Sequence, residues 1–100
     1  MSFASDVQSV QKTDTATAVN GRTRLQGLYF TNTGTAATLT FRSGGGSGTV
    51  KLTVNTPAAA GAQDLMIPDN GILFENGIHV TFSSAEVTSV TLLFVGGAAA

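Results

Sequence analysis

The chain has 100 residues, of which 42% are hydrophobic and only 11% are charged, and its formal net charge is −1. This length supports one domain. Its five scattered basic residues are too few for the basic face that nucleic-acid binding needs, and the lack of cysteine excludes disulfides and thiolate metal sites. An ordinary soluble domain carries about 25% charged residues. The composition therefore indicates a protein that works packed against other protein.

Segment 1–20 is polar, with isolated apolar side chains. It lacks the basic-then-apolar order of a secretion signal, and no stretch of the chain is long enough for a membrane span. It also has too little apolar surface for a core of its own. We therefore expect an extended N-terminal arm whose Phe3, Val7 and Val10 contact a partner.

Alternation of apolar and polar residues dominates the remainder, and a period of two predicts β-strands with one buried face. The predicted strands, in chain order, are 24–32, 36–43, 48–55, 63–67, 71–75, 78–83 and 87–95, with a further extended piece within 6–19. Short strands at this spacing predict an all-β fold, a single small antiparallel β-sandwich (jelly-roll-like) of about seven to eight strands over 21–95. Periodicity alone does not distinguish this strand order from an immunoglobulin-like one.

Strands 24–32 and 87–95 are apolar on both faces, because apolar residues follow one another without a polar partner. Such strands are central, and in so small a domain we expect a partner to cover their second face. Leu93 and Val95 are therefore interface candidates. Tyr29 and the six phenylalanines are expected in the core rather than on a sugar-stacking platform, since the chain has no Trp and the aromatic residues follow core parity.

Turn signals separate these strands. Asn32–Thr35 and Glu75–Gly77 predict hairpins, since Asn and Gly tolerate positive φ, and Pro68–Gly71 predicts a tight turn. Gly44–Gly48 is predicted to be a mobile hairpin tip, because a phosphate cradle would need a helix after its glycines and a strand follows here. Residues 96–100 are expected to form a flexible Gly/Ala tail.

The acidic residues and the one histidine do not assemble into a predicted catalytic or metal site. A catalytic His79 would need an orienting carboxylate, and strand geometry does not place Glu75 or Glu86 beside it. Asp64 and Asp69 lack the further oxygen ligands of a calcium loop, and Asp69 is typical of a turn. We therefore predict no catalytic, cofactor-binding or metal-ligating residue.

Three arginines are further interface candidates: Arg22, Arg24 and Arg42. Arg22 and Arg24 lie two residues apart at the start of a strand. Two interpretations remain open for this pair. The arginines make a fork-like contact with a carboxylate on a neighbouring subunit, or both side chains are simply solvated.

The order of features from Arg24 to Phe82 resembles that of small virion structural proteins of tailed phages, especially marine cyanophage-like viruses. A hairpin leads to Phe41-Arg42-Ser43-Gly44-Gly45, and Ser47–Leu52 (SGTVKL) follows. A Thr-Pro-Ala connection, the turn Ile67–Phe74 (IPDNGILF) and a final Thr/Val strand complete the order.

This resemblance implies a β-sandwich present in many copies in the virion, without activity or cofactor. A capsid decoration or cement protein fits best, with the major capsid protein or other virion proteins as partners. We expect a homo-oligomer, with a trimer favoured, that binds neither nucleic acid nor membrane. A tail, neck or head-fibre component and a carbohydrate- or receptor-binding module are the alternatives.

Overall fold

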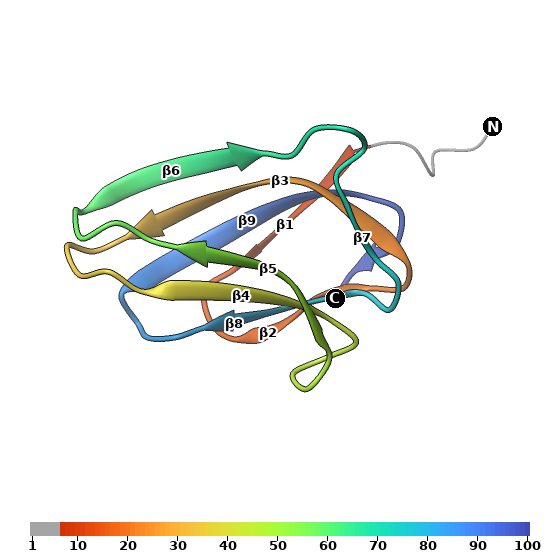
Figure 1. Cartoon of the computed structure of the whole chain (residues 1–100), viewed down its shortest axis with the longest axis horizontal. Coiled ribbons are helices and arrows are strands. Elements are labelled where there is room, and N and C mark those ends of the chain that lie inside the picture. Colours follow the sequence, from red (N-terminus) through yellow and green to blue (C-terminus); the bar gives the residue numbers. More distant parts are fainter. Residues whose placement is uncertain (1–6) are drawn as a thin grey trace.

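The computed structural model describes residues 7–100, which form ten β-strands and no helix (Figure 1). The strands are β1 (Val7–Lys12), β2 (Ala16–Asn20), β3 (Thr23–Asn32), β4 (Thr38–Ser43), β5 (Thr49–Asn55), β6 (Gly61–Met66), β7 (Ile72–Phe74), β8 (Ile78–Phe82), β9 (Val87–Val95) and β10 (Ala98–Ala99). All seven predicted core strands are present, and β9 has the predicted bounds. The part of the chain described here has no helix that is long and apolar enough to cross a membrane.

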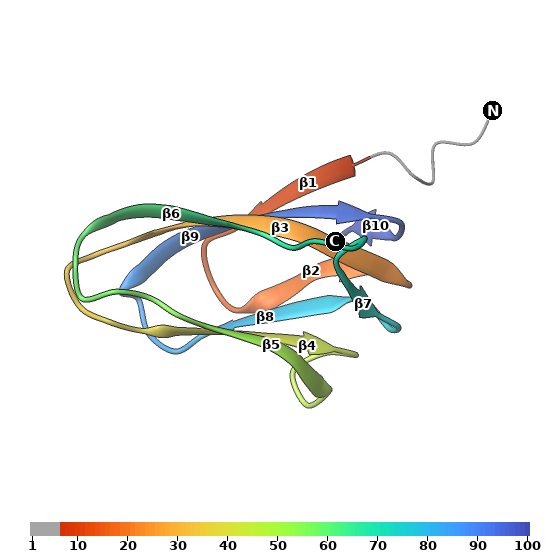
Figure 2. The same ribbon diagram turned by 45° about the horizontal axis from the view of Figure 1, so that its top comes forward.

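The strands form two antiparallel five-stranded sheets that pack face to face, which confirms the predicted β-sandwich. Sheet A has the order β1-β9-β3-β6, and β7 pairs with the other half of β3. Sheet B has the order β10-β2-β8-β4-β5. Figure 2 shows the two layers from the side, with β3 and β9 above β8 and β4.

The chain passes from one sheet to the other at every connection except β4–β5 and β6–β7. The resulting orders, β1-β9-β3 followed by β6 and β7 in sheet A and β2-β8-β4-β5 in sheet B, are those of a jelly roll. The prediction of hairpins at Asn32–Thr35 and Glu75–Gly77 is therefore wrong. The strands that these turns join, β3 with β4 and β7 with β8, lie in different sheets. Gly77 does have the expected positive φ of 89°. At Gly77 a corner between two sheets uses the positive φ that a hairpin turn also needs, so local sequence does not separate the two there.

The core lies between the two sheets. Its largest fully buried side chains are Leu25, Leu28, Leu92, Phe74, Phe94, Val87 and Val90 from sheet A, and Val19, Leu39, Phe41, Ile78 and Val80 from sheet B. A register shift between Leu25 and Gly27 lets Leu25 and Leu28 both face inward, although their sequence separation is odd. The irregularity explains part of the two-sided apolar pattern of this strand.

Residues 7–20, expected to form an arm, belong to the sandwich instead. β1 pairs with β9, and β2 pairs with β8. Ala18 and Val19 of β2 have no exposed surface. A polar segment with few apolar residues needs no separate core when each of its strands extends an existing sheet. Phe3, the other arm residue named above, lies outside the described residues.

Residues 96–100, expected to be flexible, are also tied to the sandwich. Gly96 and Gly97 have φ angles of 81° and 68°, which turn the chain from sheet A towards the edge of sheet B. Ala98–Ala99 then pairs with β2, and the Ala100 N–H donates a hydrogen bond to Ala18 O at 3.0 Å. The tail therefore covers one edge of sheet B.

Candidate functional site

Sheet A carries a group of apolar side chains on its outer face, away from the core. The strand register brings them together: Val7 lies opposite Val95, Leu93 opposite Gly27, and Gly27 opposite Met66. We call this surface the contact face. Its apolar members are Val7, Tyr29, Met66, Leu73, Leu93 and Val95, contributed by β1, β3, β6, β7 and β9.

Several of these side chains are unusually exposed for their size. The exposed fractions are 62% for Val7, 63% for Met66 and 47% for Tyr29. Tyr29 was expected in the core, and the structure corrects this, because its neighbours Leu28 and Phe30 take the inward positions and leave it the outward one. Large contiguous apolar patches often occur at interaction surfaces, so this face is a candidate for one.

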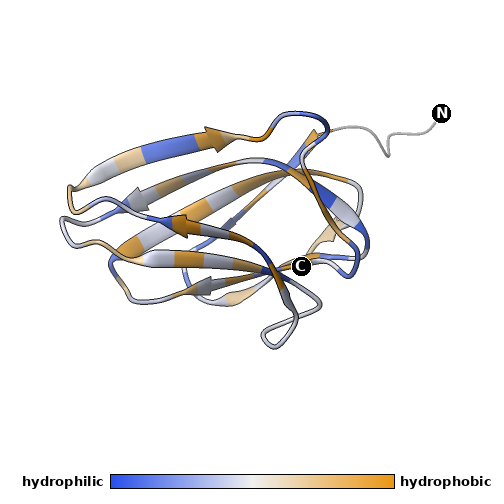
Figure 3. Cartoon of the chain, viewed as in Figure 1, coloured by the Kyte–Doolittle hydropathy of each residue, from blue (hydrophilic) through white to orange (hydrophobic). Residues whose placement is uncertain are grey.

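Strand β6 extends the contact face to the edge of the sheet. All six of its residues are exposed, and it pairs with β3 alone. Figure 3 shows that β6 is polar in its middle and apolar at its end, where Leu65 and Met66 lie. The strand lacks the lysine or proline that commonly protects a free edge.

Arg22 and Arg24 lie at one end of the contact face. With Leu73, Val95 and their neighbours they line a hollow of about 160 Å³. The Thr23 hydroxyl, which also lines the hollow, shares its proton between Val95 O at 3.0 Å and Gly96 O at 3.2 Å. Within residues 7–100 neither arginine forms an ion pair. Both guanidinium groups are thus available for a carboxylate of another molecule.

The structure thereby brings together four of the predicted interface candidates on one surface, Val7, Arg24, Leu93 and Val95, with Arg22 beside them. Two others lie elsewhere. Val10 points to the inner side of sheet A and packs against the core. Arg42 belongs to sheet B, where its Nη1 donates to Gly48 O at 3.3 Å and supports the β4–β5 hairpin.

The outer face of sheet B is polar by contrast. Its outward positions hold mainly threonines, namely Thr17, Thr38, Thr40, Thr53 and Thr81, together with His79 and Arg42. β-branched threonine suits a pleated surface that stays in contact with water. Val50, paired with Arg42 and 45% exposed, is the large apolar exception on this face. The two outer faces of the sandwich therefore differ in their apolar content, and the outer face of sheet A is the more apolar.

His79 contacts a hydroxyl rather than a carboxylate. Its Nδ1 lies 3.2 Å from Thr17 Oγ1. Glu75 is paired with Lys51 at 3.2 Å, and Glu86 accepts a hydrogen bond from the Thr33 hydroxyl. In the described range no three His, Asp or Glu residues are grouped so that they could hold a metal ion.

The predicted turns give two further outcomes. Gly44–Gly48 joins β4 to β5 as a true hairpin, as expected. Asp69 and Asn70 have φ angles of 58° and 68°, and the Gly71 N–H donates to Pro68 O at 3.1 Å. Asp69 is therefore a turn residue, which is the role predicted for it.

Comparison of the chain with protein-family models, with curated proteins and with solved structures finds no match.

Proposed function

We propose that the chain is a non-enzymatic structural subunit of a tailed-phage particle, a capsid decoration or cement protein that stabilises the head through contacts between subunits. The contact face carries this proposal, because it gathers six apolar side chains where a monomer would normally expose charge. The resemblance between residues 24–82 and small virion structural proteins supports the same assignment. The jelly-roll fold is compatible with it but hosts many functions.

The partner that we assign to the contact face is the major capsid protein. A standard interface buries about 800 Å² on each partner, with an apolar centre and a polar rim. Leu93 and Met66, on either side of Gly27, supply such a centre, while the paired Arg24 and Val95 lie towards one end and Asp64 lies on the outer strand β6. Each square ångström of apolar surface buried there contributes about 25 cal/mol. Attachment dominated by apolar contacts should depend little on salt.

Copies of the chain are proposed to associate with one another as well. Homo-oligomers generally adopt closed symmetry, and we expect a trimer on the particle. The free edge of β6 is available for such a contact, because its backbone groups are not used by another strand of the described chain.

The test is the composition of the particle. Phage particles are purified from a lysate that contains the chain, and the chain is quantified against the major capsid protein by mass spectrometry and located by electron cryomicroscopy. We expect density distributed over the shell in a fixed ratio to the capsid protein. A ring at one vertex would instead support the tail or neck alternative. A monodisperse monomer that is absent from particles would contradict the proposal.

A further inference from the structure

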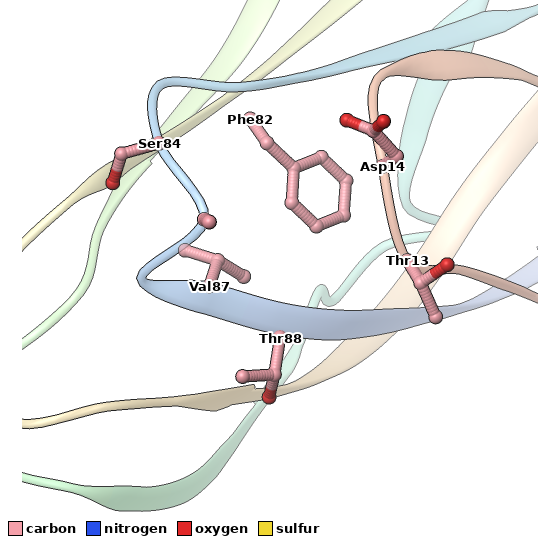
Figure 4. Close-up of a pocket in the computed structure, with 7 residues that line it drawn as sticks. Thr13, Asp14, Phe82, Ser84, Val87 and Thr88 are labelled. Atoms are coloured by element: carbon pink, nitrogen blue, oxygen red, sulfur yellow. The ribbon is translucent and has the colours of Figure 1, made fainter.

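An open hollow of about 490 Å³ lies at one end of the sandwich, where the β1–β2 turn faces the β8–β9 loop. Its lining includes apolar Phe82 and Val87 and polar Thr13, Asp14, Ser84 and Thr88 (Figure 4). Small-molecule sites have volumes of about 300–1,000 Å³ and combine apolar walls with a few placed polar groups. The hollow therefore has the size of a ligand site, and Phe82 supplies its accessible apolar surface because Val87 is almost fully buried.

Phe82 occupies the middle of this hollow. Figure 4 shows its ring between Asp14 and Val87. The side chain is half-buried, because part of it packs against the core while the rest faces the hollow. An apolar ring beside a carboxylate suits a molecule that has both C–H surface and hydroxyl groups.

The two walls of the hollow are held in place by hydrogen bonds. On one side the Phe82 N–H donates to Thr15 Oγ1 at 3.0 Å, and the Thr15 N–H donates to Asp14 Oδ1 at 2.7 Å. On the other side the Thr33 N–H donates to Glu86 O at 2.8 Å, and the Glu86 N–H donates to Ser84 Oγ at 3.3 Å. A site fixed before binding loses less entropy when a ligand arrives.

Asp14 and Thr13 leave polar groups unused in this arrangement. Asp14 Oδ2 and the Thr13 hydroxyl have no hydrogen-bond partner among residues 7–100. Asp14 is also the one charged residue in the described lining of the hollow. The free groups therefore favour a neutral ligand that donates hydrogen bonds and disfavour an anion.

We propose that this hollow binds a neutral saccharide, with one sugar face against Phe82 and a hydroxyl group donating to the Asp14 carboxylate. The site is separate from the contact face, whose residues do not line it. A chain that binds no saccharide would therefore not contradict the proposed function in the particle. Likewise, a chain that is absent from particles would not contradict saccharide binding in the hollow.

The test uses the full chain labelled with ¹⁵N and titrated with methyl glucoside, methyl galactoside, methyl mannoside and N-acetylglucosamine, with N-acetylneuraminate as the anionic comparison. At least one neutral sugar should shift the amide resonances of Asp14 and of the β8–β9 loop, with a Kd of about 1 mM. Asp14→Asn should weaken this binding at least tenfold. Phe82→Leu keeps an apolar side chain without the ring and should also weaken it.

Tyr29→Ala is the matched control, since it removes an exposed aromatic ring on the contact face and should leave the affinity unchanged. Three results would overturn the proposal: no shift in the hollow with any neutral sugar at its highest soluble concentration, undiminished binding by Asp14→Asn, or tighter binding of N-acetylneuraminate. Loss of binding in Tyr29→Ala alone would move the site to sheet A and contradict the assignment to the hollow.

Discussion

Leu93 of β9 lies directly opposite Gly27 of β3 on the contact face, and Met66 of β6 lies on the other side of Gly27. A Cβ atom at Gly27 would come within 2.9 Å of Leu65 O and 3.0 Å of Met66 Sδ. The missing side chain therefore lets β6 and the Met66 side chain lie close over β3. Leu93, Gly27 and Met66 together form an apolar row across the middle of the contact face.

Gly27→Ala should destabilise the chain by about 1–3 kcal/mol, because the added methyl group meets Leu65 O, a backbone oxygen of the paired strand β6. The free energy of unfolding measured in urea tests this. Gly34→Ala is the control, since nothing lies within 4 Å of its added Cβ, and its effect should stay within about 0.5 kcal/mol. Equal effects of the two variants would refute the close approach of β6.

Val19→Ala should lower the free energy of unfolding by about 1–3 kcal/mol, because Val19 is fully buried and its truncation leaves a cavity. Thr17→Ala, on the outer side of the same strand, should have a much smaller effect. Thermal unfolding followed by circular dichroism measures both. If residues 7–20 were an extended arm, Val19→Ala would be neutral, so a neutral result would contradict the place of β2 in sheet B.

Asn32→Ala should cost about 1–3 kcal/mol, because the Asn32 amide holds the β5–β6 connection against the end of β3. Its Nδ2 lies 2.8 Å from Thr33 O and 3.0 Å from both Pro57 O and Ala59 O, in a buried position. Asn55→Ala, at an exposed position, serves as the control. Urea unfolding should separate the two variants clearly, and an Asn32→Ala chain as stable as the control would count against this role.

Glu75 gives the fold a dependence on acidic pH. Its own backbone N–H, followed by the Lys51 ammonium group at 3.2 Å, lowers the pKa of Glu75 below its ordinary value of 4.5. A carboxyl group with a lower pKa in the folded state stabilises the fold above that ordinary value, and the contribution disappears as the pH falls through the folded-state pKa.

Glu75→Gln should therefore lower the Tm at pH 7 by a small amount, because the pair is exposed and solvent weakens it. The difference between wild type and variant should shrink as the pH falls below 4.5 and through the lowered folded-state pKa of Glu75. Calorimetry across this pH range measures it. A difference that grows on acidification would have the opposite sign and would exclude the lowered pKa as its cause.

Strand positions could be predicted because alternation is local. The pattern in residues 87–95 gives the bounds of β9 without any knowledge of its neighbours. It also marks β3 and β9 as the central apolar strands, and they are adjacent in sheet A. Their second apolar face is indeed the contact face, although the side chains there remain partly exposed in the isolated chain.

Sheet membership could not be predicted in the same way. The turns at Asn32–Thr35 and Glu75–Gly77 have hairpin chemistry, but whether a chain folds back or crosses to the other sheet depends on pairings far away in sequence. The strand at Ala16–Asn20 likewise gains its burial from β8, about 60 residues later. The hollow beside Phe82 is assembled from two loops that only this topology brings together, so no local motif marks it.

The most direct test of the contact face is the binding of the purified chain to phage shells that lack it. Leu93→Lys should weaken attachment by about 3 kcal/mol, more than a hundredfold, since it places a charge at the centre of an apolar interface. Thr40→Lys puts the same charge on the outer face of sheet B and should bind like wild type, with both variants equally folded. The assignment of this face would be contradicted if Leu93→Lys bound the shells as tightly as wild type, or if only Thr40→Lys lost its binding.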